Sequence, residues 1–437
     1  MFRKISSFIE NHLKSNSHEI LCIDGARQVG KTYIIREIGK KLFTHFVEIN
    51  FAEDSLNNRY FANVASLEDF HLILTAYYGN NIGNNEDTLI FLDEIQVYPR
   101  IFSLLKAIST ANQYKVICSG SELGLALKKD YLTPMGYVIT KRMYPMDFEE
   151  FLYATGSNFE FINQLREFYK NRTPINSSLH NLLLKKFKTY LYVGGMPASV
   201  KAFVETKNVL EIRKTQSNII AFYKEDASKY DESRKLKIKR IYEMIPSNLE
   251  NKVKRIQFTD IENIHDARFN KYIDEFDYLI NSGISLETKA ISEPKFPLIQ
   301  SSSKNLLKLY MNDVGLLTNI LYQNNINAMM NDDNTINLGS VYETVVAQEL
   351  IAHEHKLFYY DRKKVGEVDF LIDDYDNLSV LPLEVKSGKN NENYFALIKL
   401  LQIPNYNIKK GIVFSNDNKV SLENNILFLP IYYIMFI

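Results

Sequence analysis

Residues 25–32, GARQVGKT, have the types and spacing of a phosphate-binding loop. They fit G-x-x-x-x-G-K-[ST], follow an apolar run that ends at Asp24, and precede the helical pattern YIIREIGKKLF. The glycines let the backbone approach a phosphate chain, and the helix N-terminus presents unpaired N–H groups to it. Lys31 would reach the β- and γ-phosphates of ATP, and Thr32 would ligate Mg²⁺. The predicted ATP-binding residues of this loop are Gly25, Arg27, Gln28, Val29, Gly30, Lys31 and Thr32.

An acidic pair, Asp93 and Glu94, ends the segment LIFLDE of residues 89–94, whose first four residues are apolar and predict a buried strand. At the carboxyl end of this predicted strand, Asp93 would hold Mg²⁺ and Glu94 would polarise the attacking water, so the pair predicts hydrolysis as well as binding. The run VICSG ends nearby, where Ser119 is expected to sense the γ-phosphate, with Ser121 as a weaker candidate. The alternatives are a glycine-containing turn and an acidic strand end without a special role. The presence of both motifs in one chain disfavours these two alternatives.

A second set of carboxylates lies near the C-terminus. Glu343 belongs to the apolar helical pattern VYETVVAQELIA, Asp369 to the strand pattern EVDFLI, and Glu384 and Lys386 to LPLEVK. Because side chains alternate across a strand, both acids and the lysine fall on the side opposite the apolar residues. Hard oxygen ligands suit a divalent metal that activates water and clamps a phosphodiester. We therefore predict Asp369 and Glu384 as metal ligands and Lys386 as a catalytic residue.

The elements that must position these residues come from the pattern of apolar runs. Five short runs alternate with amphipathic stretches in the first part of the chain, which predicts a P-loop-type parallel sheet with helices on both faces. The predicted strands are 19–24, 45–51, 88–93, 114–120 and 137–144. A helical or winged-helix middle and a small α/β nuclease-like end complete the predicted α/β fold. The predicted divisions are 1–155 for the ATPase, 156–205 for a helical linker or lid, 206–330 for the winged-helix-like part and 331–437 for the nuclease-like domain.

Composition bounds these predictions. The 437 residues correspond to about three domains. With 46% hydrophobic and 24% charged residues, a collagen-like, disordered or coiled-coil architecture is excluded. The formal net charge is zero, so nucleic-acid binding would need a local basic patch.

Cysteine usage and the chain ends bear on the compartment. Cys22 and Cys118 are too few and too far apart for a disulfide framework or a zinc site, and we expect two small buried hydrophobic side chains. The N-terminus has no apolar signal region, and the C-terminal run ILFLPIYYIMFI is too short to span a bilayer, so it predicts a buried strand. A reduced, cytoplasmic protein without membrane attachment is expected.

A basic stretch marks the middle of the chain. Residues 201–260 contain 14 Lys and Arg against 9 Asp and Glu. The helical pattern of residues 269–283 follows, with 284–291 and 296–299 as two predicted wing strands. This order predicts a winged helix that binds nucleic acid, with DNA as the leading target; a helical lid with solvated charges is the alternative. The charges concentrate in Arg234, Lys235, Lys237, Lys239, Arg240, Lys252, Lys254 and Arg255.

Several motifs together resemble one family. They are GARQVGKT, FVEINFAE, FLDEIQ, YKVICSGSELGL, YPMDFEEFL, YVGGMPASV and LYMNDVGLL. Their order is similar to that in bacterial and archaeal AAA-type ATPases that carry a C-terminal domain of uncertain function. One departure is Gly136-Tyr137, where many relatives have Gly-Arg. In this group the resemblance implies an ATPase followed by a winged-helix-like region and a nuclease-like domain.

The tail also resembles the PD-(D/E)xK nuclease core. It has the pattern D-x(14)-E-x-K with a glutamate, Glu343, on the preceding helix, and Val368 stands where that core has proline. This resemblance implies Glu343 as a metal ligand beside Asp369 and Glu384. The resemblances imply an ATP-hydrolysing protein whose nucleotide state is coupled to a metal-dependent nuclease. The alternative is an ATP-switched binding protein with a catalytically silent tail.

Two further features are left open by the sequence. Arg142 could reach a neighbour's nucleotide in a homo-oligomer, or it could be a surface arginine. His353 and His355 could ligate a metal, but without an obvious third ligand a solvated helix end is favoured.

Overall fold

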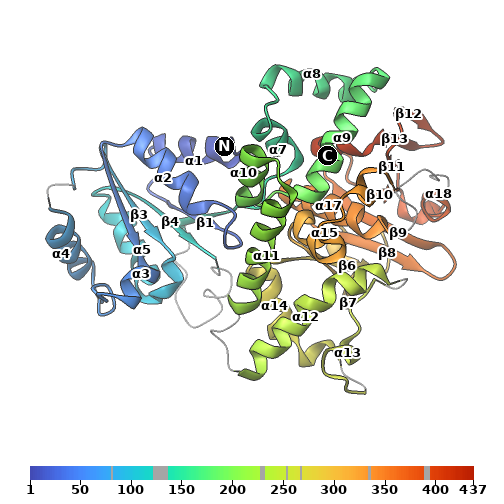
Figure 1. The fold of residues 1–437 in the computed structure, drawn as a ribbon. Helices are drawn as coiled ribbons and strands as arrows, with labels where there is room; N and C mark the ends of the chain where they lie inside the picture. The colour runs from blue at the N-terminus through green and yellow to red at the C-terminus, as the bar shows by residue number, and fades with distance from the viewer. Residues whose placement is uncertain are drawn as a thin grey trace. The chain divides into compact units, whose positions relative to one another are not determined.

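The computed structural model describes residues 1–79, 82–121, 136–226, 232–251, 254–265, 268–332, 336–387 and 394–437. Lys252 of the basic stretch and the end of the YKVICSGSELGL motif lie outside these residues. The contacts within the chain separate two compact units. The first comprises Met1–Tyr144 with Asn281–Gly283, and the second comprises Pro145–Ile280 and Ile284–Ile437. Each unit contains its own sheet (Figure 1).

The first sheet has five parallel strands in the order β2-β3-β4-β1-β5. All five were predicted, because runs buried on both faces leave a clear apolar signal. The strands are β1 Ile20–Asp24, β2 His45–Asn50, β3 Thr88–Asp93, β4 Lys115–Gly120 and β5 Val138–Arg142. Since β4 lies between β1 and β3, the carboxyl ends of the P-loop strand and the acidic strand both adjoin the end of β4.

Helices cover both faces of this sheet, as predicted (Figure 1). On one face, Cys22, Ile90 and Cys118 pack in a core with Phe70 and Leu105 from the helices. On the other face Gly39 lies close to the side chains of Phe46 and Leu89. The helical segments of this unit are α1 Ile5–Lys14, α2 Lys31–Leu42, α3 Phe51–Leu56, α4 Leu67–Tyr78, η2 Ile95–Val97 and α5 Pro99–Ala111.

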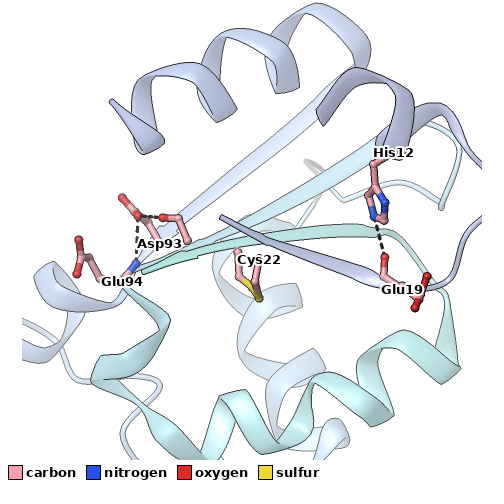
Figure 2. The surroundings of a disulfide bond; sticks show 7 residues. His12, Glu19, Cys22, Asp93 and Glu94 are labelled. Atoms are coloured by element: carbon pink, nitrogen blue, oxygen red, sulfur yellow. Dashed lines mark hydrogen bonds between the residues drawn. A yellow bond between two sulfur atoms is a disulfide. The ribbon is translucent and has the colours of Figure 1, made fainter. Parts of the chain in front are cut away.

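The cysteines differ from the prediction. Both are buried, as expected, but Cys22 and Cys118 form a disulfide, so the expectation of two reduced thiols is wrong (Figure 2). The register of β1 on β4 pairs these two residues directly, with their Cα atoms 4.6 Å apart. Their separation of 96 residues gave no local signal, because the pairing depends on which strands become neighbours.

The segments after residue 144 are mainly helical until the second sheet begins. Among the described residues, no helix is long and apolar enough to cross a bilayer. The helical segments are α7 Phe148–Ala154, α8 Phe159–Lys170, α9 Ser177–Val193, α10 Pro197–Thr206, α11 Val209–Asp226, α12 Glu232–Glu250, α13 Phe258–Glu262, η4 Phe269–Lys271, α14 Ile273–Asn281, η5 Leu298–Ser301, α15 Val314–Tyr322, α16 Asn327–Met330, α17 Gly339–Ala352, α18 Phe395–Leu401, η6 Pro404–Tyr406 and η7 Ile431–Phe436.

The second sheet has eight strands in the order β12-β13-β11-β10-β9-β8-β6-β7. It is mixed: β9 is antiparallel to both β8 and β10, whereas β10 and β11 are parallel. The strands are β6 Ser285–Ile291, β7 Ser302–Met311, β8 Phe358–Arg362, β9 Gly366–Asp374, β10 Ser379–Val385, β11 Gly411–Ser415, β12 Ser421–Glu423 and β13 Ile426–Pro430. The C-terminal apolar run forms β13 and then continues as the buried turn η7.

The predicted wing differs from the observed hairpin. The first wing strand is β6, but residues 298–301 form η5, and the partner of β6 is the later strand β7. In addition, β6 pairs with β8, so this hairpin belongs to the same sheet as the C-terminal strands. Local patterning could not reveal this pairing, because residues far apart in the chain form it. The four-part division of the chain and the winged helix stay predictions.

Candidate functional site

The phosphate-binding loop connects β1 to α2 through residues 25–30. Gly25, Gln28 and Gly30 have positive φ angles of 142°, 67° and 97°. A Cβ on Gly25 would lie 2.2 Å from the carbonyl oxygen of Met143, so this position requires glycine. The loop therefore has a backbone shape that its glycines make accessible.

Lys31 closes this loop from inside. Its Nζ donates hydrogen bonds of 2.8 Å to the carbonyl oxygens of Gly25 and Ala26. Burial lowers the pKa of this ammonium, although nearby carboxylates, including Glu94, oppose the shift. The ammonium is thus held by neutral carbonyls that a phosphate can outcompete.

The Asp93 carboxylate accepts several hydrogen bonds at the end of β3. The Thr32 hydroxyl donates to Asp93 Oδ2 at 2.9 Å, and the Ser119 hydroxyl and the Glu94 amide donate to Oδ1. The strand register explains this, because Leu92 pairs with Cys118 and the next residue of each strand is Asp93 or Ser119. Burial raises the pKa of Asp93. Figure 2 shows Asp93 and Glu94 at this strand end.

Glu94 lies in a polar group that the sequence analysis identified only in part. It has a left-handed φ of 54°, and its Oε2 accepts a hydrogen bond of 2.5 Å from Gln96 Nε2. The Ser121 hydroxyl lies 3.5 Å from the same oxygen and accepts a 3.2 Å hydrogen bond from Arg27 Nε. Gln96 was missed as a functional residue, although its place two residues after Glu94 was a usable signal.

Two arginines flank the loop. Arg3, which no motif signals, donates to the carbonyl oxygens of Val29 at 2.8 Å and Tyr144 at 2.6 Å. Arg142 Nε lies 3.7 Å from a carboxylate oxygen of Asp24, its register partner in β1. Arg142 therefore has a partner within its own chain.

The tail acids come together as their parity predicted. Antiparallel pairing of Phe370 with Leu383 places Asp369 and Glu384 on neighbouring strands, and the Val385 amide donates to Asp369 Oδ2 at 2.8 Å. The side that carries the acids is covered rather than open, since both strands are buried along their centres on both faces. Glu343, Asp369 and Glu384 are all buried.

Lysines pair with two of the three tail acids and with the neighbouring Glu367. Lys386 Nζ donates to Glu384 Oε1 at 2.6 Å. Lys254 forms an ion pair with Glu343, which also accepts a 3.0 Å hydrogen bond from the Tyr310 hydroxyl. The buried Lys308 pairs with Glu367. Lys254 and Lys308 were not predicted to belong to this group, because 89 and 35 residues separate them from Glu343 in the sequence.

The buried charges of this group shift one another's pKa values. Burial, reinforced by Glu343, raises the pKa of Asp369 to about 6, and burial together with Asp369 raises that of Glu384 to about 8. For Glu343, burial acts in the same direction, but the ammonium groups of Lys254 and Lys308 outweigh it and lower the pKa. Among the residues that the structure describes, no cluster of three or more His, Cys, Asp or Glu side chains is placed to hold a metal ion. The tail metal site stays a prediction.

Several charges of the basic stretch are paired within the chain. Arg234 lies 3.2 Å from Asp274, Lys235 3.3 Å from Glu225, and Lys237 3.9 Å from Glu262, while Arg255 pairs with Asp361. The local positive field is therefore weaker than the residue count implies.

The structure also describes the surroundings of His353 and His355, the two histidines of the segment HEH at residues 353–355. His353 Nε2 lies 3.5 Å from Asp147 Oδ2, and burial lowers the pKa of His355.

Family comparisons cover most of the chain in three segments. Residues 17–152 match an AAA domain. Residues 184–327 match a domain of unknown function (DUF8612), and residues 338–434 match another (DUF4143). A comparison with curated protein sequences gave no match.

Solved structures show more distant similarity. The Walker-type ATPase PABY2304 of Pyrococcus abyssi is 14% identical, with a TM-score of 0.44 over 72% of this chain and 95% of that one. The Aeropyrum pernix Orc1 protein in complex with DNA is 11% identical, with a TM-score of 0.31 over 76% and 91%. AMPPCP-bound DnaA of Aquifex aeolicus is 11% identical, with a TM-score of 0.30 over 63% and 87%. No residue's role is transferred at these TM-scores.

The AAA-domain match agrees with the parallel sheet, the phosphate-binding loop and the Thr32–Asp93 contact. The N-terminal region is therefore a P-loop ATPase domain of the AAA type. The C-terminal region is a mixed sheet with buried acid–lysine pairs, and its matched families carry no assigned function.

Proposed function

We propose that this protein binds Mg²⁺–ATP in the loop of residues 25–32 and hydrolyses it. The observation that carries the proposal is the meeting of Thr32, Asp93 and Ser119 at the carboxyl edge of the sheet. Hydroxyl and carboxylate oxygens suit Mg²⁺, so Thr32 and Asp93 fit as the residues that hold it. When bound, Mg²⁺ would neutralise charge on the β- and γ-phosphates.

The proposal assigns a residue to each step of hydrolysis. Lys31 would exchange the carbonyls of Gly25 and Ala26 for phosphate oxygens, and Ser119 would contact the γ-phosphate. Glu94 would accept a proton from water as the water oxygen forms a bond to the γ-phosphorus. The bond from that phosphorus to the bridging oxygen then breaks, which yields ADP and inorganic phosphate.

Two substitutions test this proposal. Glu94→Gln should retain ATP binding and lose turnover, because the amide cannot accept the proton. Steady-state phosphate release and ATP titration measure the two properties separately. Turnover by Glu94→Gln equal to that of the unaltered protein would exclude Glu94 as the base.

For the tail we propose a metal-dependent site that acts on phosphodiesters of nucleic acid, with its state coupled to the nucleotide. Support comes from the joint burial of Glu343, Asp369 and Glu384 with Lys386 at hydrogen-bond distance from Glu384. Glu343, Asp369 and Glu384 would hold the metal, and Lys386 would stabilise developing charge.

A second candidate is favoured by a specific observation. Because lysines already pair with Glu343 and Glu384, the tail could instead be a silent binding module that ATP regulates. Incubation of the full chain with labelled DNA and RNA, with and without ATP and Mg²⁺ or Mn²⁺, separates the two candidates. Cleavage that Asp369→Asn abolishes supports the nuclease, and binding without cleavage supports the regulator.

A further inference from the structure

The three buried acids of the tail and the lysines beside them form one group, here called the tail cluster: Glu343, Asp369, Glu384, Lys254, Lys308 and Lys386. One of its lysines comes from outside the sheet. Lys254 lies between the end of α12 and the start of α13, 89 residues before Glu343, with which its ammonium forms an ion pair. Its side chain is 19% exposed, whereas that of Glu343 is 6% exposed. The ammonium thus reaches from the edge of the cluster onto a buried carboxylate.

The other two lysines are held differently. Lys386 is two residues from its partner Glu384 in the chain, and Lys308 belongs to β7 with a side chain only 1% exposed. Lys308 therefore cannot leave the cluster without disturbing β7, whereas the side chain of Lys386 is 20% exposed, much as that of Lys254 is. Lys254 differs from Lys386 in its place in the chain, because it reaches the acids from the segment between α12 and α13 and not from the strand pair that carries Asp369 and Glu384.

A second, independent observation points to a cation at the same place. Glu384 Oε2 is buried and has no hydrogen-bond partner among the described residues, although Oε1 accepts from Lys386. A buried carboxylate oxygen without a donor is costly, and a cation would relieve that cost. Glu343, Asp369 and Glu384 also lie close enough to one another for their charges to interact.

We propose that Lys254 is an internal counter-ion that competes with a divalent cation for this acid cluster. When ionised, Glu343, Asp369 and Glu384 carry three negative charges against the two positive charges of Lys254 and Lys386. Withdrawal of Lys254 leaves a net charge of minus two, which one divalent cation balances. Lys254 is therefore a positioning residue that sets whether the site takes metal, and this inference rests on the metal site proposed above for the tail.

The test measures Mn²⁺ binding to the full chain without nucleotide, by electron paramagnetic resonance and by thermal unfolding. Lys254→Met removes the charge and keeps the length of the side chain. It should bind one more Mn²⁺ than the unaltered protein, or bind it about tenfold more tightly, and Mn²⁺ should raise its unfolding temperature. Arg255→Met is the matched control, because this neighbour pairs with Asp361 instead and should leave Mn²⁺ binding unchanged.

Adding Asp369→Asn to Lys254→Met should remove the gained site, while binding at the phosphate loop stays the same in both. The proposal is overturned if Lys254→Met gains no Mn²⁺, if the gain survives Asp369→Asn, or if circular dichroism shows that losing Lys254 unfolds the chain. Gained Mn²⁺ without cleavage of DNA or RNA would contradict the proposed nuclease and support the counter-ion. Cleavage by the unaltered protein that Lys254→Met does not enhance would support the nuclease and contradict the counter-ion.

Discussion

The ATP site and the tail cluster both gather carboxylates beside a sheet, but they hold them in different ways. Asp93 lies at the end of β3, whereas the tail acids lie on helix α17 and within strands β9 and β10. At the ATP site, Asp93 accepts hydrogen bonds from the neutral hydroxyls of Thr32 and Ser119, and the ammonium of Lys31 donates to backbone carbonyls. In the tail, Glu343 and Glu384 pair directly with lysine ammonium groups. The first site keeps its positive and negative charges apart, and the second has already joined them.

This difference affects what each site can bind. A hydroxyl can rotate from a carboxylate to a metal ion at little cost, so in the proposed function the ATP site takes Mg²⁺ and phosphate without breaking an ion pair. An ammonium must be removed from its carboxylate before a metal can replace it, and breaking a buried ion pair is costly. Metal binding as proposed for the tail therefore requires a displacement step that the ATP site does not need.

The largest effect is expected from Lys31→Ala. The Lys31 ammonium donates to two neutral carbonyl oxygens and is expected to bind phosphate oxygens in their place. Its loss should therefore abolish detectable ATP binding and leave the fold intact. Titration with a fluorescent ATP analogue checks this. Lys40→Ala is the control, since Lys40 is an exposed residue of the same helix. Full ATP affinity in Lys31→Ala would show that this ammonium does not bind phosphate, and would contradict the contrast between the ATP site and the tail cluster.

The second largest effect is expected on the free energy of unfolding, which should fall more when the tail cluster is altered than when the ATP site is. Glu343→Gln leaves the ammonium of Lys254 without its buried partner and should lower the free energy of unfolding by about 3 kcal/mol. Asp93→Asn keeps acceptors for neutral donors and should cost about 1 kcal/mol. Urea denaturation monitored by circular dichroism compares the two. Equal losses would mean that the type of partner does not distinguish the sites.

A smaller effect is expected at Gln96. Its amide holds Glu94 Oε2, so Gln96→Leu should lower the kcat of ATP hydrolysis about tenfold by misplacing the base, with the KM for ATP unchanged. Phosphate release at a series of ATP concentrations separates the two constants. If kcat is unaffected, the contact only stabilises the loop after β3.

The smallest effect concerns the basic stretch. The structure gives Arg234, Lys235 and Lys237 acidic partners, so nucleic-acid contacts should depend on Lys239 and Arg240. Replacing both with Gln should reduce the log–log salt dependence of duplex binding by about 1.8, which corresponds to two lost phosphate contacts. Binding measured at several salt concentrations provides the slope. An unchanged slope would show that this helix does not contact nucleic acid.

The sequence by itself determined the parts of both sites that are local. The loop from Gly25 to Thr32 depends on neighbouring residues whose φ angles and side chains are set within one strand–loop–helix unit. The juxtaposition of Asp93 and Ser119 follows from parallel strands ending at one edge, and that of Asp369 and Glu384 from the alternation of side chains along two paired strands. Periodicity and motif spacing carry this kind of information.

Only the tertiary structure decided which distant segments complete the sites. Arg3 reaches Val29, Lys254 reaches Glu343, and Cys22 bonds to Cys118 across separations that leave no local pattern. The β6–β7 hairpin likewise joins the C-terminal sheet through β8. Each of these contacts depends on strand order and helix packing, which arise when the whole chain buries its apolar surface. A charged or sulfur-bearing side chain finds its partner only after that burial has chosen its neighbours.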